Sequence, residues 1–263
     1  MIDLKKFFTD DAATYAKQGI VLYRFDVSKS EEFIQDLLVP MREAYIAEEK
    51  INHIQEKRKK TRQEIIENRL PIDPEIKSGD FGEILTYYIA RQYFASDANV
   101  TPMKWRFKDD KKKASPKTDI LLFFKPDVDI ASPEDTMYSI EVKTQASNPY
   151  KTSAIFKAVK DANVDRTSRA VETIDHLLTR IEETDEQDEF YDAIARFGGA
   201  YKVPYTKKFH AVAVVESKFL TNHLENIPDT MYSDYAGIDI YCLPIAALYN
   251  MYLKVYEQLP TKA

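Results

Sequence analysis

The stretch that decides the fold lies between Thr118 and Gln145, where the sequence reads T-D-I-L-L-F-F at 118–124 and Y-S-I-E-V-K-T-Q at 138–145. Aliphatic and aromatic residues fill both halves, and a Pro/Asp/Ser loop separates them, so two strands are predicted over Asp119–Phe124 and Tyr138–Lys143. Side chains alternate along a strand, which puts Ser139, Glu141, Lys143 and Gln145 on one face and Tyr138, Ile140 and Val142 on the other. A hairpin would bring Asp119 beside Glu141, an arrangement that suits a divalent cation with a lysine next to it.

Length and composition restrict the class of protein. A chain of 263 residues buries a substantial core and suggests one large domain with an appended segment. The apolar runs are too short to cross a bilayer and the N-terminus lacks the features of a signal peptide, so no membrane partner is expected. Cys242 is the single cysteine, which excludes an internal disulfide and fits a reducing, cytoplasmic location.

The net charge of −6 argues against a protein that coats nucleic acid by bulk electrostatics. Positive charge is nevertheless concentrated in two clusters, Lys57–Lys60 with Arg62 and the segment Lys104–Lys117, which includes Lys111, Lys112 and Lys113. Such clusters are more often solvated faces than sites. The second cluster is a candidate for contacts with the phosphate groups of a substrate.

The rest of the chain alternates between helical and strand patterns, which predicts an α/β fold with a mixed sheet flanked by helices. We expect helices at Ser30–Val39 (ended by Pro40), Arg42–Leu70, from Asp80, Pro149–Glu183 with a break at Asn163–Thr167, Ser217–Asn226 and Pro244–Gln258, and strands at Ile20–Val27, Trp105–Phe107, Phe209–Val215 and Ile238–Leu243. The narrow apolar stripe of 42–70 indicates either a long charged helical arm for a partner or a helix lying along the domain. The prolines in Leu70–Pro74 predict a boundary between an N-terminal segment, residues 1–70, and a domain at 71–263.

Several classes of enzyme and binding site are excluded because the sequence lacks their motifs. The chain has no glycine-rich nucleotide-binding loop, no G-x-S-x-G elbow and no histidine and cysteine spacing typical of zinc sites. The tripeptide E-x-K occurs at Glu48, Glu75, Glu141 and Glu216. Only Glu141-Val142-Lys143 lies within an alternating strand that follows an aspartate-led strand.

Asp119 and Glu141-Val142-Lys143, preceded by a helix that carries Glu83, resemble the PD-(D/E)XK nuclease superfamily and its restriction-endonuclease-like core. Thr118 stands where the motif's name has proline. The resemblance implies that Asp119, Glu141 and the carbonyl of Val142 hold Mg²⁺ or Mn²⁺ and that Lys143 orients the nucleophile or stabilises developing charge. It further implies that Glu83 supports a second metal or its water, while Gln145 touches the substrate or the outer shell of the metal.

Each residue also has a structural interpretation. Asp80 and Glu83 have the spacing of a capping box, Asp119 has the position of a turn residue, and Glu141 with Lys143 has the spacing of an ordinary surface ion pair.

A narrower resemblance rests on chain length, on G-E-I-L-T-Y-Y at 82–88 and on the position of E-V-K. These are similar to the nuclease subunit (HamA) of the Hachiman anti-phage system, which implies a DNA substrate and a helicase partner in a bacterial defence complex. One alternative is a nuclease-like fold without catalysis that serves as a binding or regulatory subunit. Another is an acidic interaction protein in which the motif is coincidental.

Overall fold

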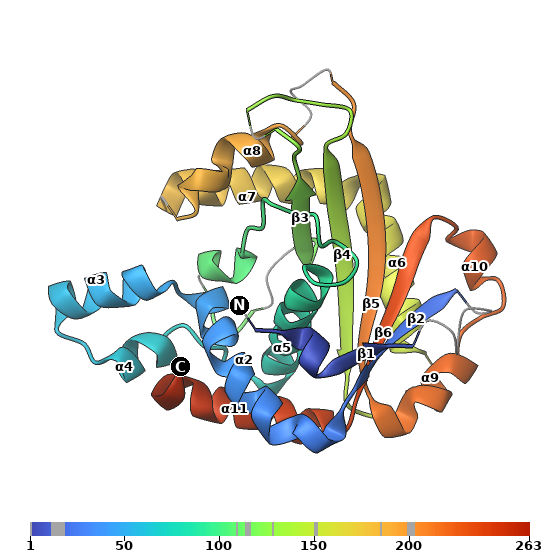
Figure 1. Ribbon diagram of the computed structural model, residues 1–263, viewed down its shortest axis with the longest axis horizontal. Helices are drawn as coiled ribbons and strands as arrows, with labels where there is room; N and C mark the ends of the chain where they lie inside the picture. Colours follow the sequence, from blue (N-terminus) through green and yellow to red (C-terminus); the bar gives the residue numbers. More distant parts are fainter. Residues whose placement is uncertain are drawn as a thin grey trace.

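A mixed sheet of six strands forms the centre of the part of the chain that the structure describes (Figure 1). This computed structural model describes residues 2–11, 19–108, 110–113, 117–127, 129–149, 152–184, 186–198 and 203–263. The strands are β1 (Phe8–Asp10), β2 (Ile20–Phe25), β3 (Ile120–Phe124), β4 (Thr136–Gln145), β5 (Thr206–Glu216) and β6 (Ile238–Ile245), in the spatial order β1-β2-β6-β5-β4-β3. The four central strands are parallel to one another, and each edge strand is antiparallel to its neighbour. The predicted α/β class with a mixed sheet is confirmed.

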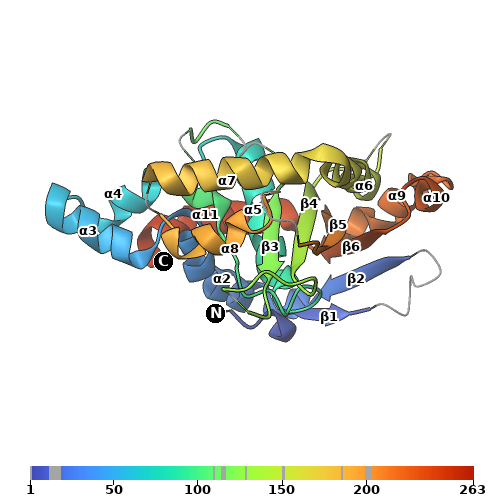
Figure 2. The same ribbon diagram turned by 90° about the horizontal axis from the view of Figure 1, so that it is seen from above.

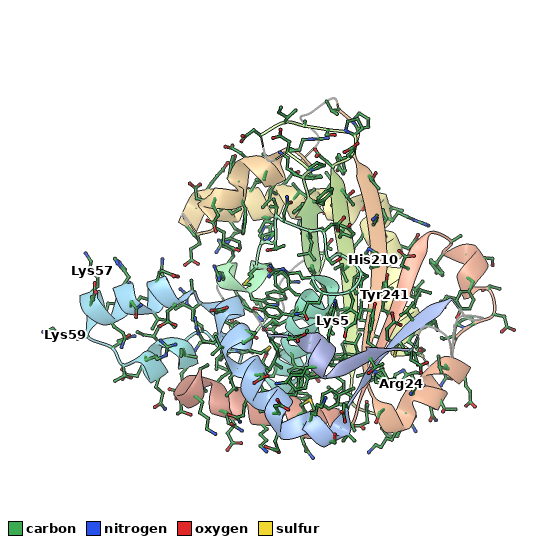
Figure 3. The ribbon with its side chains drawn as sticks, viewed as in Figure 1. Lys5, Arg24, Lys57, Lys59, His210 and Tyr241 are labelled. Carbon is green, nitrogen blue, oxygen red and sulfur yellow. The ribbon has the colours of Figure 1, made fainter. Side chains whose placement is uncertain are left out.

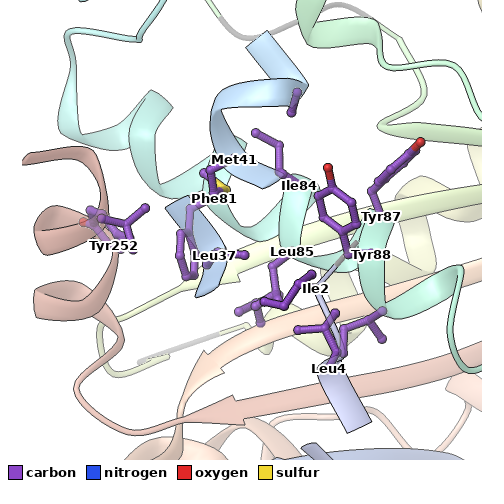
Figure 4. Packing of buried hydrophobic residues seen from close by; sticks show 14 of the residues in the cluster. Ile2, Leu4, Leu37, Met41, Phe81, Ile84, Leu85, Tyr87, Tyr88 and Tyr252 are labelled. Atoms are coloured by element: carbon purple, nitrogen blue, oxygen red, sulfur yellow. The ribbon is translucent and has the colours of Figure 1, made fainter. Parts of the chain in front are cut away.

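Two helical layers cover the sheet. Helices α6 (Ala154–Val164) and α7 (Ala170–Thr184) lie along one face, as Figure 2 shows, and pack on a cluster that includes Leu121, Met137 and Ala211. Helices α2 (Ser30–Tyr45), α5 (Pro74–Ala90) and α11 (Leu248–Lys262) build the other cluster with Tyr138, Ile140 and Val142. Figure 4 shows its centre, where Phe81 and Leu85 of α5 meet Leu37 and Met41 of α2. The alternation predicted for β4 therefore sorts its side chains between the two layers.

Three helix boundaries differ from the prediction. Helix α2 continues through Pro40 to Tyr45, because its buried face, which includes Leu37, Met41 and Ala44, gains enough from packing to offset the lost hydrogen bond. The predicted long helix is two helices, α3 (Glu48–Arg58) and α4 (Arg62–Glu67), which form a hairpin that turns at Lys59 in the left-handed region with φ 52°. Helix α5 begins at Pro74, with Pro at its first turn, and not at Asp80.

Two predicted elements have another conformation. Trp105 and Phe107 belong to a 3-10 helix, η4 (Lys104–Phe107), and are buried there. Pro244 lies inside β6 opposite Val215, so the closing helix α11 starts four residues later, at Leu248. The shorter elements are the helices η1 (Leu4–Lys6), η3 (Val27–Lys29), η6 (Asp188–Phe190), α8 (Tyr191–Ala195), η7 (Ser217–Phe219), α9 (Leu220–Glu225) and α10 (Met231–Asp234).

The break predicted within Pro149–Glu183 exists as a π-helical turn, η5 (Asp165–Arg169), between α6 and α7. A π turn inserts an extra residue into a helix and often marks a functional position. No helix within the described ranges is both long and apolar enough to pass through a membrane.

Candidate active site

The β3–β4 hairpin brings the first two acidic residues together. Ile120 pairs with Ile140 in an antiparallel register, so Asp119, one residue before β3, stands opposite Glu141. The backbone N–H of Val142 donates to Oδ2 of Asp119 at 2.8 Å. Asp119 is 9 % exposed and Glu141 only 2 % exposed. Both carboxylates are thus held at the edge of an apolar layer, where ionisation requires a positive partner.

Glu141 has two cationic partners. The ammonium of Lys143 lies 2.6 Å from its Oε1, and the guanidinium of Arg169 donates to its Oε2 at 2.8 Å. Lys143 also pairs with Asp161 at 2.8 Å, and Arg169 with Asp165 at 2.5 Å. These charges form one network because Asp161 near the end of α6, and Asp165 and Arg169 in η5, face Glu141 and Lys143 of β4.

Two buried hydroxyl groups hold Asp165, the acidic partner of Arg169, in place. Asp165 accepts a hydrogen bond from Oγ1 of Thr118 at 2.9 Å and a longer one from Ser139 at 3.4 Å. Thr118 therefore positions Asp165. This arrangement links the residue before Asp119 to the helix turn that carries Arg169.

Glu83 reaches the site from the opposite layer, on α5. Helix α5 approaches β4 closely at Gly82, where an added Cβ would lie 1.8 Å from Oγ1 of Thr144. The side chain of Glu83 accepts a hydrogen bond from the indole N–H of Trp105 at 3.1 Å. Lys104 connects it to the hairpin, since its ammonium lies 3.1 Å from Oε2 of Glu83 and 3.5 Å from Oδ1 of Asp119. Four sequence-predicted residues are therefore in one network, with Lys104 as the bridge.

Burial governs the protonation of these carboxyl groups. Burial raises the pKa of Glu83 to about 8, with Asp119 and Asp80 adding to the effect and Lys104 opposing it. Burial also raises the pKa of Glu141 to about 9, aided by Asp119 and opposed by Lys143. Although burial lowers the pKa of Lys143, the charges of Glu141 and Asp119 raise it above its usual value. An ionised Glu141 is thus stable only with positive charge at its oxygens, which Lys143 and Arg169 supply.

The capping-box interpretation of Asp80 and Glu83 is wrong. Helix α5 begins at Pro74, so both residues lie inside the helix and not at its start. Asp80 is buried and accepts from Lys108 and from the hydroxyl of Tyr45. The other E-x-K sequence at a strand end has a structural role, since Glu216 accepts the first backbone N–H groups of α11, those of Ala247 and Leu248.

The remaining predicted residues lie around this network. Gln145 follows Lys143 on β4 and donates to the carbonyl of Ser147 at 3.3 Å. In the basic turn, Lys111 reaches the carbonyl of Glu67 at 3.5 Å, while Lys112 and Lys113 are exposed. Of these three lysines, Lys113 lines the cavity described next, together with Asp110, its ion-pair partner at 3.5 Å.

A cavity of about 320 Å³ lies beside Asp119, between η4, β3 and α7. Its wall is largely apolar and includes Trp105, Phe107, Leu121 and Leu177, and its charged residues include Lys104, Lys108, Lys113 and Arg180. Asp119 is therefore reached from a concave surface that carries positive charge.

The network also contains four residues that were not predicted from the sequence as site residues: Lys104, Asp161, Asp165 and Arg169. Asp161, Asp165 and Arg169 recur every four residues, a spacing that places them on one side of a helix and was available in the sequence. Lys104 was part of a lysine-rich segment and carried no distinguishing signal. Among the described residues, no group of three or more His, Cys, Asp or Glu side chains has the arrangement of a metal site. Each carboxylate of the network instead faces an ammonium or a guanidinium group.

Comparison with known proteins gives one family. No curated protein matches the chain. The sequence model of the HamA family matches residues 2–259, which contains all of the residues of the network. This chain therefore belongs to the HamA family.

Proposed function

We propose that this chain is a metal-dependent nuclease that hydrolyses phosphodiester bonds of DNA, as the effector subunit of an anti-phage defence complex that contains a helicase. The observation that carries the proposal is the meeting of Asp119, Glu141 and Lys143 across one hairpin, with Glu83 joined to them through Lys104. Membership of the HamA family supports the role in defence.

The donor chemistry fits a hard divalent cation. Carboxylate oxygens of Asp119 and Glu141, with the carbonyl of Val142, are ligands that Mg²⁺ and Mn²⁺ prefer. A bound cation would replace part of the positive charge that Lys104 and Arg169 now place next to these oxygens. When bound, Mg²⁺ supplies charge neutralisation at the phosphodiester and lowers the pKa of the attacking water.

The chain's own residues would supply the rest of the chemistry. The ammonium of Lys143, fixed between Glu141 and Asp161, is a preorganised positive charge for the oxygen on which negative charge develops. Glu83, held by Trp105 and Lys104, would orient water from the opposite layer. The apolar wall of the cavity excludes solvent from one side of Asp119 and strengthens these electrostatic interactions.

The test is plasmid degradation with Mg²⁺ by wild type and by Lys143→Ala, each alone and with the protein that copurifies. We expect a loss of rate on the order of 100-fold or more in Lys143→Ala, as for removal of one preorganised charge. The matched control is Lys218→Ala, which changes the exposed lysine of the other strand-end E-x-K sequence. Equal cleavage by wild type and Lys143→Ala, or the same loss in Lys218→Ala, would contradict the assignment.

A second candidate function is a binding subunit without catalysis. It is favoured by the pairing of every carboxylate in the network with a cation of the chain itself. In that case Lys143→Ala retains both the partner and the biological activity of the complex, whereas the nuclease proposal requires the variant to lose protection against phage while it retains the partner.

A further inference from the structure

The hairpin of α3 and α4 carries a second feature that the proposed active site does not use. We refer to residues 48–67 as the arm and to Lys57–Lys60 as the arm tip. Figure 1 shows the arm extending from one side of the molecule, and in Figure 3 the labelled Lys57 and Lys59 lie at its far end. All four residues of the arm tip are basic and exposed.

The arm is held in one conformation by contacts along its length. The guanidinium of Arg62 in α4 binds both carboxylate oxygens of Glu48 in α3, at 2.5 and 2.9 Å. Thr61 and Glu64 form a reciprocal capping box at the start of α4. At its base, Ile51 and Ile65 are buried in the core cluster. The arm tip is thus preformed, so a ligand would meet ordered charges without a large entropic cost for the backbone.

The arm tip forms no salt bridge within the described part of the chain. Across the described residues, none of the four forms an ion pair or a side-chain hydrogen bond, whereas Lys6, Arg24 and Lys254 elsewhere on the protein all pair with acidic residues. Four adjacent cations repel one another, and a chain with net charge −6 offers abundant acidic partners. Their isolation at the end of a rigid hairpin indicates an anionic partner outside the chain.

The chemistry of the arm favours a polyanion over a protein surface. The large hydrophobic side chains that are exposed in the described part of the chain all lie outside residues 48–67. Protein interfaces have apolar and aromatic cores, which the arm tip lacks, while contacts to the phosphates of nucleic acid depend on Lys and Arg.

Basic residues also connect the arm to the candidate active site. The turn at 110–113 rests on the arm through Lys111, whose ammonium reaches the carbonyl of Glu67 at 3.5 Å. Lys113 of the same turn lines the cavity that contains Asp119. The lysines of this turn therefore lie between the cavity and the base of the arm.

We propose that the arm tip binds the phosphate backbone of duplex DNA, without regard to sequence, at a distance from the bond that is cut. This inference rests on the proposed nuclease function for its choice of ligand. It predicts a contribution to DNA affinity that depends strongly on salt, because each neutralised phosphate releases counterions.

The experiment measures duplex binding by the full chain in EDTA, by fluorescence anisotropy, from about 50 to 200 mM salt, the range over which phosphate contacts are most visible. The variant K57Q/R58Q/K59N/K60Q removes the charge, and Asn at 59 tolerates the left-handed backbone. The control K5Q/K6Q/K207Q/K218Q removes the same number of charges from exposed lysines outside the arm. Thermal unfolding verifies that both variants remain folded.

We expect the arm-tip variant to lose on the order of 100-fold in affinity near 0.1 M salt and its salt slope to fall by about 2–4, as for two to four phosphate contacts. The control should retain both values within a few-fold. An equal loss in both variants, no change in either, or no binding by wild type would overturn the proposal. A variant that keeps its DNA affinity but loses the copurifying protein would assign the arm tip to that protein instead. Because EDTA prevents cleavage, the result is readable whether or not the chain proves to be a nuclease.

Discussion

Replacement of Gly82 by alanine tests how α5 delivers Glu83 to the site. The added Cβ would lie 1.8 Å from Oγ1, 3.1 Å from Cβ and 3.4 Å from Cγ2 of Thr144, all below or near the limit of van der Waals contact. Rotation of Thr144 relieves only the first of these contacts, so α5 and β4 must also move apart. The substitution therefore acts on stability and on the position of Glu83 together.

The magnitude follows from two opposing effects. Overpacking of a buried contact costs about 1–3 kcal/mol, and a contact of 1.8 Å belongs to the upper part of that range, about 2–3 kcal/mol. Replacement of a helical glycine by alanine returns about 1 kcal/mol. We expect a net loss of about 1–2 kcal/mol in the free energy of unfolding, which lowers Tm by roughly 2–6 °C for a chain of this size. Circular dichroism during heating measures the shift.

Two variants make the test specific. Gly79 lies on the same helix with no atom within 4 Å of an added Cβ, so Gly79→Ala should leave Tm unchanged or raise it. Thr144→Ala removes a buried hydroxyl that has no hydrogen-bond partner among the described residues, and it should restore most of the stability lost in Gly82→Ala. The same penalty for Gly82→Ala in both Thr144 backgrounds, or none in the wild type, would refute the close approach of α5 and β4.

Three further predictions concern charged and titratable residues. His210 is buried among aromatic rings, and burial lowers its pKa to about 3, so protonation of this histidine in the unfolded chain destabilises the native state as pH falls below about 6.5. His210→Phe should reduce the dependence of the free energy of unfolding on pH by up to about 1.4 kcal/mol per pH unit, as measured by urea unfolding. Parallel curves for the variant and the wild type would contradict this interpretation. Arg169→Met leaves the carboxylate of Glu141 with one cation fewer and should lower the free energy of unfolding by about 2–4 kcal/mol. Adding Glu141→Gln should recover part of this stability, and additive losses in the double variant would exclude the ion pair between Arg169 and Glu141. Lys104→Met removes the ammonium between the carboxylates of Glu83 and Asp119, so saturating Mg²⁺ should raise the Tm of the variant more than that of the wild type. An equal or smaller rise in the variant would argue against a cation site between these two carboxylates.

The sequence predicted the hairpin and its acidic residues well, because both depend on short-range information. Alternation places Glu141 and Lys143 on one face of β4, and a single register step then brings Asp119 opposite Glu141. The central strands β5 and β6 were equally clear as apolar runs. The structure extends β5 by three residues at its start and one at its end, and β6 by two residues at its end only.

The errors occurred where tertiary contacts or single residues override local preference. Packing carries α2 through Pro40, and the left-handed Lys59 divides the arm, although T-x-x-E at Thr61–Glu64 was a readable start signal. The four-residue spacing relates Arg169 to Asp165, but no periodic pattern relates it to Glu141, 28 positions away. Lys104 could not be assigned, because its contact with Asp119 joins residues 15 positions apart.

The position of Trp105 has an experimental consequence. It is the only tryptophan of the chain, its indole N–H bonds to Glu83, and its ring lines the cavity beside Asp119. The tryptophan fluorescence of the protein, excited selectively over that of its 17 tyrosines, thus originates beside the candidate active site. An ion that reaches Glu83, or a nucleotide that enters the cavity, would change the emission of an unlabelled sample, so occupancy can be followed optically and separately from turnover.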